Sequence, residues 1–208
     1  MKRFYKAATA AANGAGWQVM LDGRGVKTQG GRAQIVPTQA LAEAMAAEWA
    51  DQGEEIDPKA FILRDMADYA IDVIAGDRDA AVSALMPYAE TDTLCYRADP
   101  GQPLLKRQEA TWEPFLAAAE QRWGVTFERV AGIIHRAQPP ATLQRLREVL
   151  SGKDDFTLAA LRSMAGLAAS MTIALGALEP GADAEALWEL ANLEEDFQTE
   201  MWGQDAEA

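Results

Sequence analysis

The chain has 208 residues and a formal net charge of −13, from 19 lysine and arginine residues against 32 aspartate and glutamate residues. A protein that binds nucleic acid or an anionic membrane needs a basic surface, so this charge disfavours both kinds of partner. The length allows one domain or two small ones with a hydrophobic core, and residues 179–208 carry ten acidic residues and no basic residue.

The first forty residues have the pattern of a small antiparallel sheet. Apolar and polar residues mix in short runs, and residue pairs typical of tight turns separate these runs. We expect four strands, over residues 3–9, 16–21, 24–28 and 33–36, with turns at Asn13-Gly14, Asp22-Gly23 and Gly30-Gly31. A sheet of this size is marginally stable alone, so its apolar face must pack against another element.

From Thr38 onwards the pattern becomes helical. Thr38 is a good N-cap, and apolar residues at helical spacing follow it up to Trp49. Glycine and proline then separate six further helices, expected near residues 62–75, 78–97, 103–123, 140–151, 155–178 and 183–202. Residues 127–134 alternate weakly and are a candidate strand. The sequence thus predicts an α+β fold, with an N-terminal antiparallel β domain and one following helix over 1–58 and a larger helical bundle over 59–208.

Cys95 and His135 are the single cysteine and histidine, which excludes an intrachain disulfide and leaves no ligand set for structural zinc. We expect Cys95 to be a buried thiol and His135 to be a structural or surface residue. The best candidate for a membrane span, residues 163–178, is shorter than the roughly 20 residues that a span needs, so it predicts a buried core helix. Residues 23–28 have the residue types of a phosphate-binding loop without its spacing. We therefore expect no metal, no cofactor and no membrane insertion.

Catalysis would have to come from acidic residues, which occur as neighbours at Glu54-Glu55, Asp154-Asp155 and Glu194 to Asp196. Neighbouring side chains point about 100° apart on a helix, so adjacency does not make a catalytic pair. No nucleophile, base or metal set converges with them in the sequence. The pattern favours a binding protein over an enzyme, with a carboxylate-dependent hydrolase as an alternative.

The predicted C-terminal helix mixes apolar and acidic residues on the same faces. In one continuous helix, Glu194 falls inside an apolar stripe that includes Leu187, and Glu195 falls between Trp188 and Trp202. A carboxylate in such surroundings must find a cation or hydrogen bonds, or its pKa rises. Both glutamates therefore need a partner, either inside the bundle or on another protein.

Two interpretations of these carboxylates follow. In the first, each forms an internal salt bridge with an arginine of the bundle, such as Arg97 or Arg107. In the second, they belong to a mixed aromatic and acidic surface that binds a partner. The central position of Glu194 in the stripe favours the first interpretation for that residue, and the tryptophans beside Glu195 favour the second for it.

Short motifs along the chain occur in the same order in a known family. They are Arg3 to Lys6, Gly16-Trp17, Leu21 to Arg24, Val26 to Thr28, Val36 to Thr38, Glu48-Trp49, Ile56 to Pro58, Thr91-Asp92, Leu94 to Ala98, Arg107-Gln108, Leu193 to Gln198 and Trp202-Gly203. Each motif alone is weak, but the ordered set is specific and spans nearly the whole chain. In these motifs the sequence resembles the assembly chaperones of the F-type ATP synthase that handle the α subunit in mitochondria and α-proteobacteria.

The resemblance implies a small N-terminal β domain and a C-terminal orthogonal helical bundle, with no cofactor and no catalysis. It implies a chaperone that binds the free ATP synthase α subunit and shields its interface until it joins the β subunit. The important acidic residue of the family lies in the Leu-Glu-Glu segment near the C-terminus, which is Glu194 or Glu195 here. With their aromatic neighbours, the predicted partner-binding residues are Trp188, Glu194, Glu195, Phe197 and Trp202.

We expect the free protein to be a monomer. The family motifs begin at Arg3, so we expect a protein of the bacterial cytoplasm, or a trimmed form in the mitochondrial matrix. A scaffold or adaptor for another subunit of a membrane complex is the alternative that residue patterns alone do not separate from this chaperone.

Overall fold

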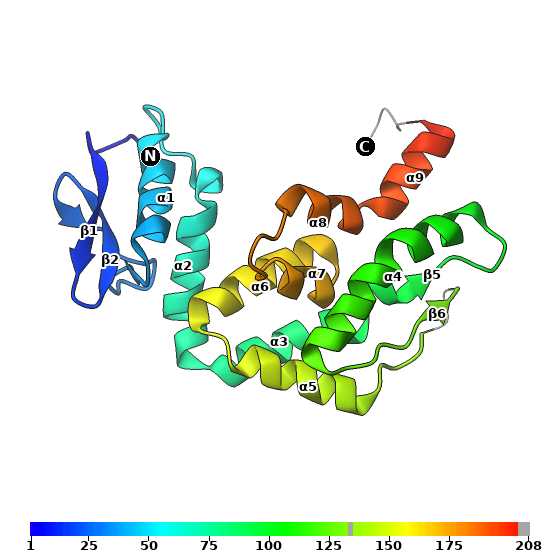
Figure 1. The fold of residues 1–208 in the computed structure, drawn as a ribbon. Coiled ribbons are helices and arrows are strands. Elements are labelled where there is room, and N and C mark those ends of the chain that lie inside the picture. Colours follow the sequence, from blue (N-terminus) through cyan, green and yellow to red (C-terminus); the bar gives the residue numbers. More distant parts are fainter. Residues whose placement is uncertain (133–134, 204–208) are drawn as a thin grey trace. The chain divides into compact units, whose positions relative to one another are not determined.

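The computed structural model describes residues 1–132 and 135–203, and its N-terminal residues form a four-stranded antiparallel sheet (Figure 1). The strands are β1 (Ala8–Asn13), β2 (Gly16–Leu21), β3 (Arg24–Gly25) and β4 (Ile35–Val36). β1 pairs with the whole of β2, while β3 and β4 pair with opposite ends of β2. Asp22 and Gly23 have φ angles of 47° and 80°, the conformation of the tight hairpin turn that Asp-Gly predicts. The predicted antiparallel sheet is therefore confirmed, but β3 and β4 are shorter than the predicted ranges 24–28 and 33–36.

The first strand begins at Ala8 rather than at residue 3, which corrects the predicted range. The chain before it runs beside the residues that follow α1 (Gln39–Ala50), where Arg3 N–H donates to the Glu54 carbonyl at 2.8 Å. The Arg3 guanidinium also donates to the Gln52 carbonyl at 2.6 Å. These hydrogen bonds hold the segment before Ala8, in which Lys2 forms an isolated antiparallel bridge with Glu55 outside the sheet.

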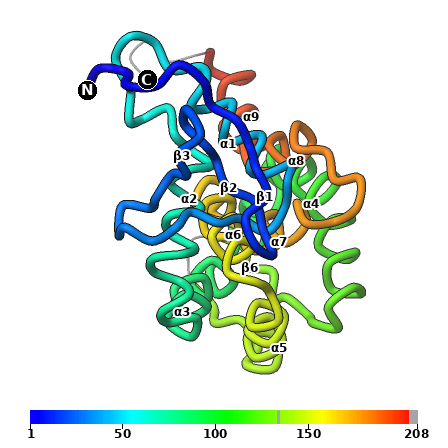
Figure 2. Tube along the Cα trace, turned by 90° about the vertical axis from the view of Figure 1, so that its left-hand side faces the viewer, coloured from blue at the N-terminus to red at the C-terminus, as the bar shows by residue number. Residues whose placement is uncertain are grey.

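α1 covers the sheet and supplies much of the N-terminal core. Leu41 N–H donates to Thr38 Oγ1 at 3.2 Å, so Thr38 is the N-cap, as predicted. Figures 1 and 2 both show α1 beside the hairpin of β1 and β2, on which it packs. Its buried face consists of Ala42, Met45, Ala46 and Trp49. The other buried members of this core are Tyr5, Val19, Leu21, Val26, Val36, Ile56, Phe61 and Ala67.

α2 (Ile62–Asp72) packs on α1 and holds the loop between β3 and β4. The Asp68 carboxylate accepts a hydrogen bond from Gln29 N–H at 3.1 Å. The Asp72 carboxylate accepts one from Gly30 N–H at 2.8 Å. Two carboxylates on one helix thereby fix the loop. Two short 3-10 helices flank α2: η1 (Pro58–Ala60) and η2 (Ile74–Gly76).

The rest of the chain is mostly helical, as predicted. Its helices are α3 (Arg78–Glu90), α4 (Pro103–Trp123), α5 (Pro140–Ser151), α6 (Asp155–Ala168), α7 (Met171–Gly176), α8 (Ala184–Ala191) and α9 (Leu193–Trp202). A 3-10 helix, η3 (Thr93–Cys95), precedes β5 (Tyr96–Arg97), which pairs in parallel with β6 (Val130–Ala131). Cys95 is buried, as predicted, and His135 is exposed.

The predicted helix over 78–97 is wrong beyond Glu90. Asp92 is fully buried and accepts hydrogen bonds from Leu94 N–H at 3.1 Å and from Thr172 N–H at 2.8 Å. An inward-pointing carboxylate that caps two segments turns the chain out of the helix. The candidate strand over 127–134 is confirmed only as β6, and Ile133 and Ile134 lie outside the described residues.

The predicted helices over 155–178 and 183–202 are each two helices. Ala169 has a φ of 47°, and the Ser170 hydroxyl then caps α7 by accepting from Ile173 N–H at 3.0 Å. Every residue of α7 is buried, as expected of a core segment. Asn192 separates α8 from α9. Across the described ranges, no helix combines the length and the apolar character that crossing a membrane requires.

Contacts between residues divide the chain into two compact units. The first contains Met1–Arg78 and Asp154–Ala160, and the second contains Asp79–Lys153 and Leu161–Ala208. Residues 59–78 belong to the first unit, since α2 packs on α1. The boundary between residues 58 and 59, as a boundary between independently folding domains, stays a prediction.

Candidate functional site

α8 and α9 carry all five predicted partner-binding residues and belong to the second unit (Figure 1). Asp183 caps the N-terminus of α8. The indole N–H of Trp112 on α4 donates to the Leu190 carbonyl at 2.9 Å, and the buried Leu193 begins α9 after the break at Asn192. These contacts anchor both helices to α4 and fix the directions of their side chains.

An apolar groove of about 160 Å³ lies between α8 and the helices α6 and α7. Leu167 and Trp188, at its edge, are 71% and 55% exposed. Large exposed apolar side chains beside an open apolar groove are typical of a protein interaction site. The residues that line the groove are all apolar: Met164, Leu167, Ala168, Ile173, Ala177, Ala184, Leu187, Trp188 and Ala191.

Glu194 is part of the internal structure, as the first interpretation has it, but through a different partner. It is half-buried and accepts a hydrogen bond from Gln108 Nε2 at 2.6 Å. Gln108 is fully buried, and its Oε1 accepts from Ala98 N–H at 2.8 Å. A polar chain therefore joins α9 to α4 and to the segment before α4.

Glu195 is exposed, and within residues 1–132 and 135–203 it has no hydrogen-bond or ion-pair partner. The predicted placement of Glu195 between Trp188 and Trp202 on one helix is wrong, because the break at Asn192 puts Trp188 on α8 and Glu195 on α9. Trp202 is 76% exposed and follows Glu195 by seven residues, about 10 Å along the helix axis. The surface thus holds a free carboxylate with exposed aromatic rings on two helices.

The first interpretation paired these glutamates with an arginine such as Arg97 or Arg107, but both arginines pair with other carboxylates. Arg107 forms two hydrogen bonds to the Glu200 carboxylate, at 2.6 and 2.9 Å. Its guanidinium carbon lies 6.0 Å from the ring centroid of the half-buried Phe197. Phe197 and Glu200 therefore help to hold α9 against α4.

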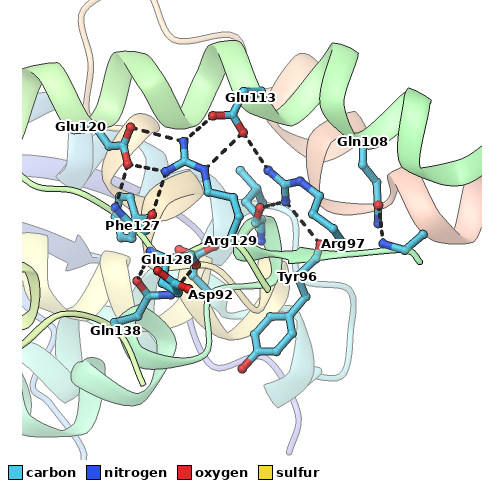
Figure 3. A network of polar contacts seen from close by, with 12 residues as sticks. Asp92, Tyr96, Arg97, Gln108, Glu113, Glu120, Phe127, Glu128, Arg129 and Gln138 are labelled. Atoms are coloured by element: carbon cyan, nitrogen blue, oxygen red, sulfur yellow. Dashed lines mark hydrogen bonds and ion pairs between the residues drawn. The ribbon is translucent and has the colours of Figure 1, made fainter. Parts of the chain in front are cut away.

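Arg97, the other candidate, belongs to an ion network that joins β5 and β6 to α4 (Figure 3). Arg97 lies 3.3 Å from the Glu113 carboxylate and donates to the Leu94 carbonyl. Arg129 lies 2.5 Å from Glu113 and also pairs with Glu120. The hydrogen bond from Arg129, with that from Arg97, lowers the pKa of the Glu113 carboxyl. These charges pair with one another, so the network ties β5 and β6 to α4 within the fold.

The sequence analysis missed the wall of the groove that α6 and α7 provide. The α8 stripe itself was detectable, since Ala184, Leu187 and Ala191 recur at helical spacing and predict that α8 packs on an apolar surface. The spacing of residues in α8 does not show that this helix packs on Leu167 and Ile173, because the choice of neighbour depends on tertiary packing.

The side chains of this surface are apolar, aromatic or acidic. Within the described ranges, no group of three or more histidine, cysteine, aspartate and glutamate side chains is placed to hold a metal ion. Burial raises the pKa of the Cys95 thiol to about 12, so Cys95 is a poor nucleophile at neutral pH. An apolar groove and an unpaired carboxylate instead match a protein partner with apolar and cationic or N–H groups.

The two neighbouring glutamates should differ in their effect on stability. Replacing Glu194 with alanine leaves the buried Gln108 amide without its charged acceptor, so we expect a loss of about 1.5–3 kcal/mol of unfolding free energy. Replacing Glu195 with alanine should change it by less than about 0.5 kcal/mol. Urea unfolding followed by circular dichroism at pH 7 measures both, and equal losses would contradict the assignment.

Comparison with protein families gives a match over most of the first two thirds of the chain. The model of the ATP12 chaperone protein family matches residues 2–120. The chain belongs to the ATP12 chaperone family. The family resemblance seen in the sequence motifs is therefore confirmed, and membership of a chaperone family favours a binding protein over an enzyme.

Relatives of the ATP12 chaperone family support the same assignment. The mitochondrial atp12 protein of Schizosaccharomyces pombe is 28% identical over 97% of this chain and 74% of its own length. The crystal structure of Atp12 from Paracoccus denitrificans is 34% identical with a TM-score of 0.90, covering 99% of this chain and 88% of that one. An aspartate-to-lysine mutant of the Paracoccus protein has the same values.

A further similar structure, of a chaperone candidate from Agrobacterium tumefaciens, is 35% identical with a TM-score of 0.92. It covers 99% of this chain and 78% of that one. These similarities confirm the α+β fold class, with N-terminal antiparallel strands followed mostly by helices.

Proposed function

We propose that this protein is an assembly chaperone of the F-type ATP synthase that binds the free ATP synthase α subunit and shields its interface until it joins the β subunit. The observation that carries the proposal is the apolar groove beside α8, open to solvent on a chain of the ATP12 chaperone family. We call the groove, together with Trp188, Glu195 and Trp202, the α8–α9 surface.

A subunit that assembles into a ring must be protected from aggregation while it is alone, and this surface is suited to that protection. While alone, such a subunit exposes an apolar face that its neighbour later covers, and exposed faces of that size drive aggregation. A protein that covers the face stabilises the native subunit by mass action, in proportion to the logarithm of its concentration over its Kd. Release then requires a contact of moderate strength, with an apolar centre and a polar rim.

The five predicted site residues divide into two roles in this proposal. Trp188, Glu195 and Trp202 are exposed and would contact the client directly. Glu194 and Phe197 contact α4 residues and would act by positioning α9. The acidic excess of residues 179–208 would favour a client face with cationic groups and keep complexes apart in solution.

The location proposed for this chaperone follows its client. One relative is a mitochondrial protein and others come from bacteria, so we propose the mitochondrial matrix or the bacterial cytoplasm. We propose that the free protein is a monomer, whose α8–α9 surface is available to the client.

Co-expression with the ATP synthase α subunit tests the client. We expect the soluble yield of the α subunit to rise several-fold over its yield alone, because the chaperone binds only the native form. The ATP synthase β subunit, co-expressed in the same way, is the control and should gain nothing. An α subunit that stays equally insoluble under matched expression would exclude it as the client. Co-purification of another membrane-complex subunit instead would favour a scaffold or adaptor.

A further inference from the structure

The first unit contains a larger open cleft that the proposed function does not use. Its volume is about 610 Å³, and its floor includes the buried side chains of Tyr5, Leu21, Val26 and Trp49. Phe4, at its edge, is 64% exposed. We call it the N-terminal cleft, lined by Phe4, Tyr5, Leu21, Asp22, Arg24, Gly25, Val26, Lys27, Thr28, Gln29, Trp49, Arg64 and Asp68.

Three cations line the N-terminal cleft. Arg24 and Lys27 are exposed, and neither has a salt-bridge partner among the residues that the structure describes. Arg64 lies with its guanidinium carbon 3.9 Å from the ring centroid of Phe61 and pairs with Asp65 at 2.6 Å. Two of the three cations are therefore available to an anionic occupant.

The two acidic residues of the cleft are occupied by the fold. The Asp22 carboxylate accepts hydrogen bonds from the N–H groups of Lys6 and Ala7, at 3.1 and 2.9 Å, and these bonds lower its pKa. The Asp68 carboxylate accepts hydrogen bonds from Gln34 Nε2 at 2.5 Å and from Gln29 N–H at 3.1 Å. No salt bridge joins either carboxylate to a cation of the cleft, although the charge of Arg24 also contributes to the lowered pKa of Asp22.

Trp49 adds a donor that the fold leaves unused. It lines the cleft and is 7% exposed, and its buried indole N–H has no acceptor in the described part of the chain. A buried donor without an acceptor destabilises the fold and is rare in folded proteins. The nitrogen itself is covered, so an occupant that supplies an acceptor must displace neighbouring atoms to reach it.

We propose that the N-terminal cleft binds an extended acidic peptide segment of a partner protein, in which a carboxylate side chain neighbours a large apolar one. The carboxylate pairs with Arg24 and Lys27, and the apolar side chain packs on Phe4 and the apolar floor. The charge of this occupant is opposite to that expected at the α8–α9 surface. The chain's net charge of −13 disfavours a nucleic acid as the occupant.

A fluorescein-labelled peptide of alternating glutamate and leucine or phenylalanine is the probe, with fluorescence anisotropy of the full chain as the readout. Lys27→Glu should weaken binding by about fivefold to tenfold, because it places a like charge against the carboxylate. Lys59→Glu is the matched control, since Lys59 is exposed, lies in the same unit and does not line the cleft. Lys59→Glu should change the affinity for the peptide by less than about twofold. Thermal unfolding confirms that both variants are folded.

A second measurement locates the peptide. In nitrogen–proton correlation spectra, the indole signal of Trp49 is identified by its loss in Trp49→Phe, and the acidic peptide should shift it. Absence of binding at about 1 mM peptide overturns the proposal. Three other results also overturn it. They are a Lys59→Glu variant that weakens binding as much as Lys27→Glu, a peptide with lysine in place of glutamate that binds equally well, and an oligothymidylate that binds more tightly than the acidic peptide. No step uses the ATP synthase α subunit, so the result is independent of the proposed function.

Discussion

Glu195→Lys is expected to abolish the gain in soluble ATP synthase α subunit while leaving thermal unfolding nearly unchanged. The Glu195 side chain is exposed and has no partner among the described residues, so its replacement should alter the unfolding free energy by less than about 0.5 kcal/mol. At a contact with a cationic or N–H group, the same change places a repulsive charge at the interface. We expect client affinity to fall by more than about tenfold.

The matched control for this charge reversal is Glu90→Lys, which makes the same change in net charge on the exposed end of α3. It should keep the full gain in soluble α subunit. Trp188→Ala should lose most of it, because it removes a large apolar side chain from the groove edge. If Glu195→Lys keeps the full gain in soluble α subunit at wild-type stability, Glu195 is not part of the site. If the variant instead unfolds at a lower temperature, Glu195 stabilises the fold.

Local signals in the sequence were enough for those elements whose ends are set by their own residues. Thr38 caps α1, and Asp22-Gly23 forms the tight turn, through interactions within a few residues. α4 begins at Pro103 and ends before Gly124, whose φ of 66° is the left-handed conformation that stops a helix. Such ends are predictable because the capping groups lie in the same short segment.

The breaks that sequence analysis missed depend on residues distant in the chain. α7 is separate from α6 because Asp92, 80 positions earlier, accepts from Thr172 N–H. Ser170 is a good N-cap, but a serine inside an apolar run also fits a continuous helix. Neither the period nor the composition of residues 155–178 decides between the two.

The candidate site was predictable only in part for the same reason. The sequence indicates that α8 and α9 carry acidic and aromatic residues. It separated Glu194 from Glu195 by their positions around one continuous helix, but the structure has two helices there. What separates them in the structure is Gln108, which contacts Glu194 from α4. A contact between residues 86 positions apart cannot be derived from helical spacing.

Asp92→Ala is expected to cause the largest loss of stability. The Asp92 carboxylate is fully buried and accepts hydrogen bonds from Thr172 N–H at 2.8 Å, from Thr172 Oγ1 at 2.7 Å and from Leu94 N–H at 3.1 Å. Alanine leaves three buried donors without an acceptor, which should cost about 3–5 kcal/mol. At about 2–4 °C per kcal/mol for a chain of this size, the melting temperature should fall by about 6–20 °C.

The control is Glu90→Ala, an exposed acid on the preceding helix, which should melt within about 2 °C of the wild type. Asp92→Ala should also reduce the soluble yield of the ATP synthase α subunit, because Thr172 and Ile173 belong to α7, which forms one wall of the groove. Melting of Asp92→Ala within the range of the control would show that this carboxylate is not a structural anchor.

The dependence of this loss on pH has a defined sign. Burial raises the pKa of Asp92 above its ordinary value of 3.8, against the lowering effect of the hydrogen bonds from Thr172, Ser170 and Leu94. The folded state therefore binds a proton more readily than the unfolded state, so the contribution of this group to stability rises as the pH falls through its raised pKa towards 3.8.

The difference in unfolding free energy between wild type and Asp92→Ala should widen over that window. Urea unfolding of both proteins at several pH values measures it, and a difference that narrows as the pH falls would mean that the hydrogen bonds to the ionised carboxylate outweigh its burial.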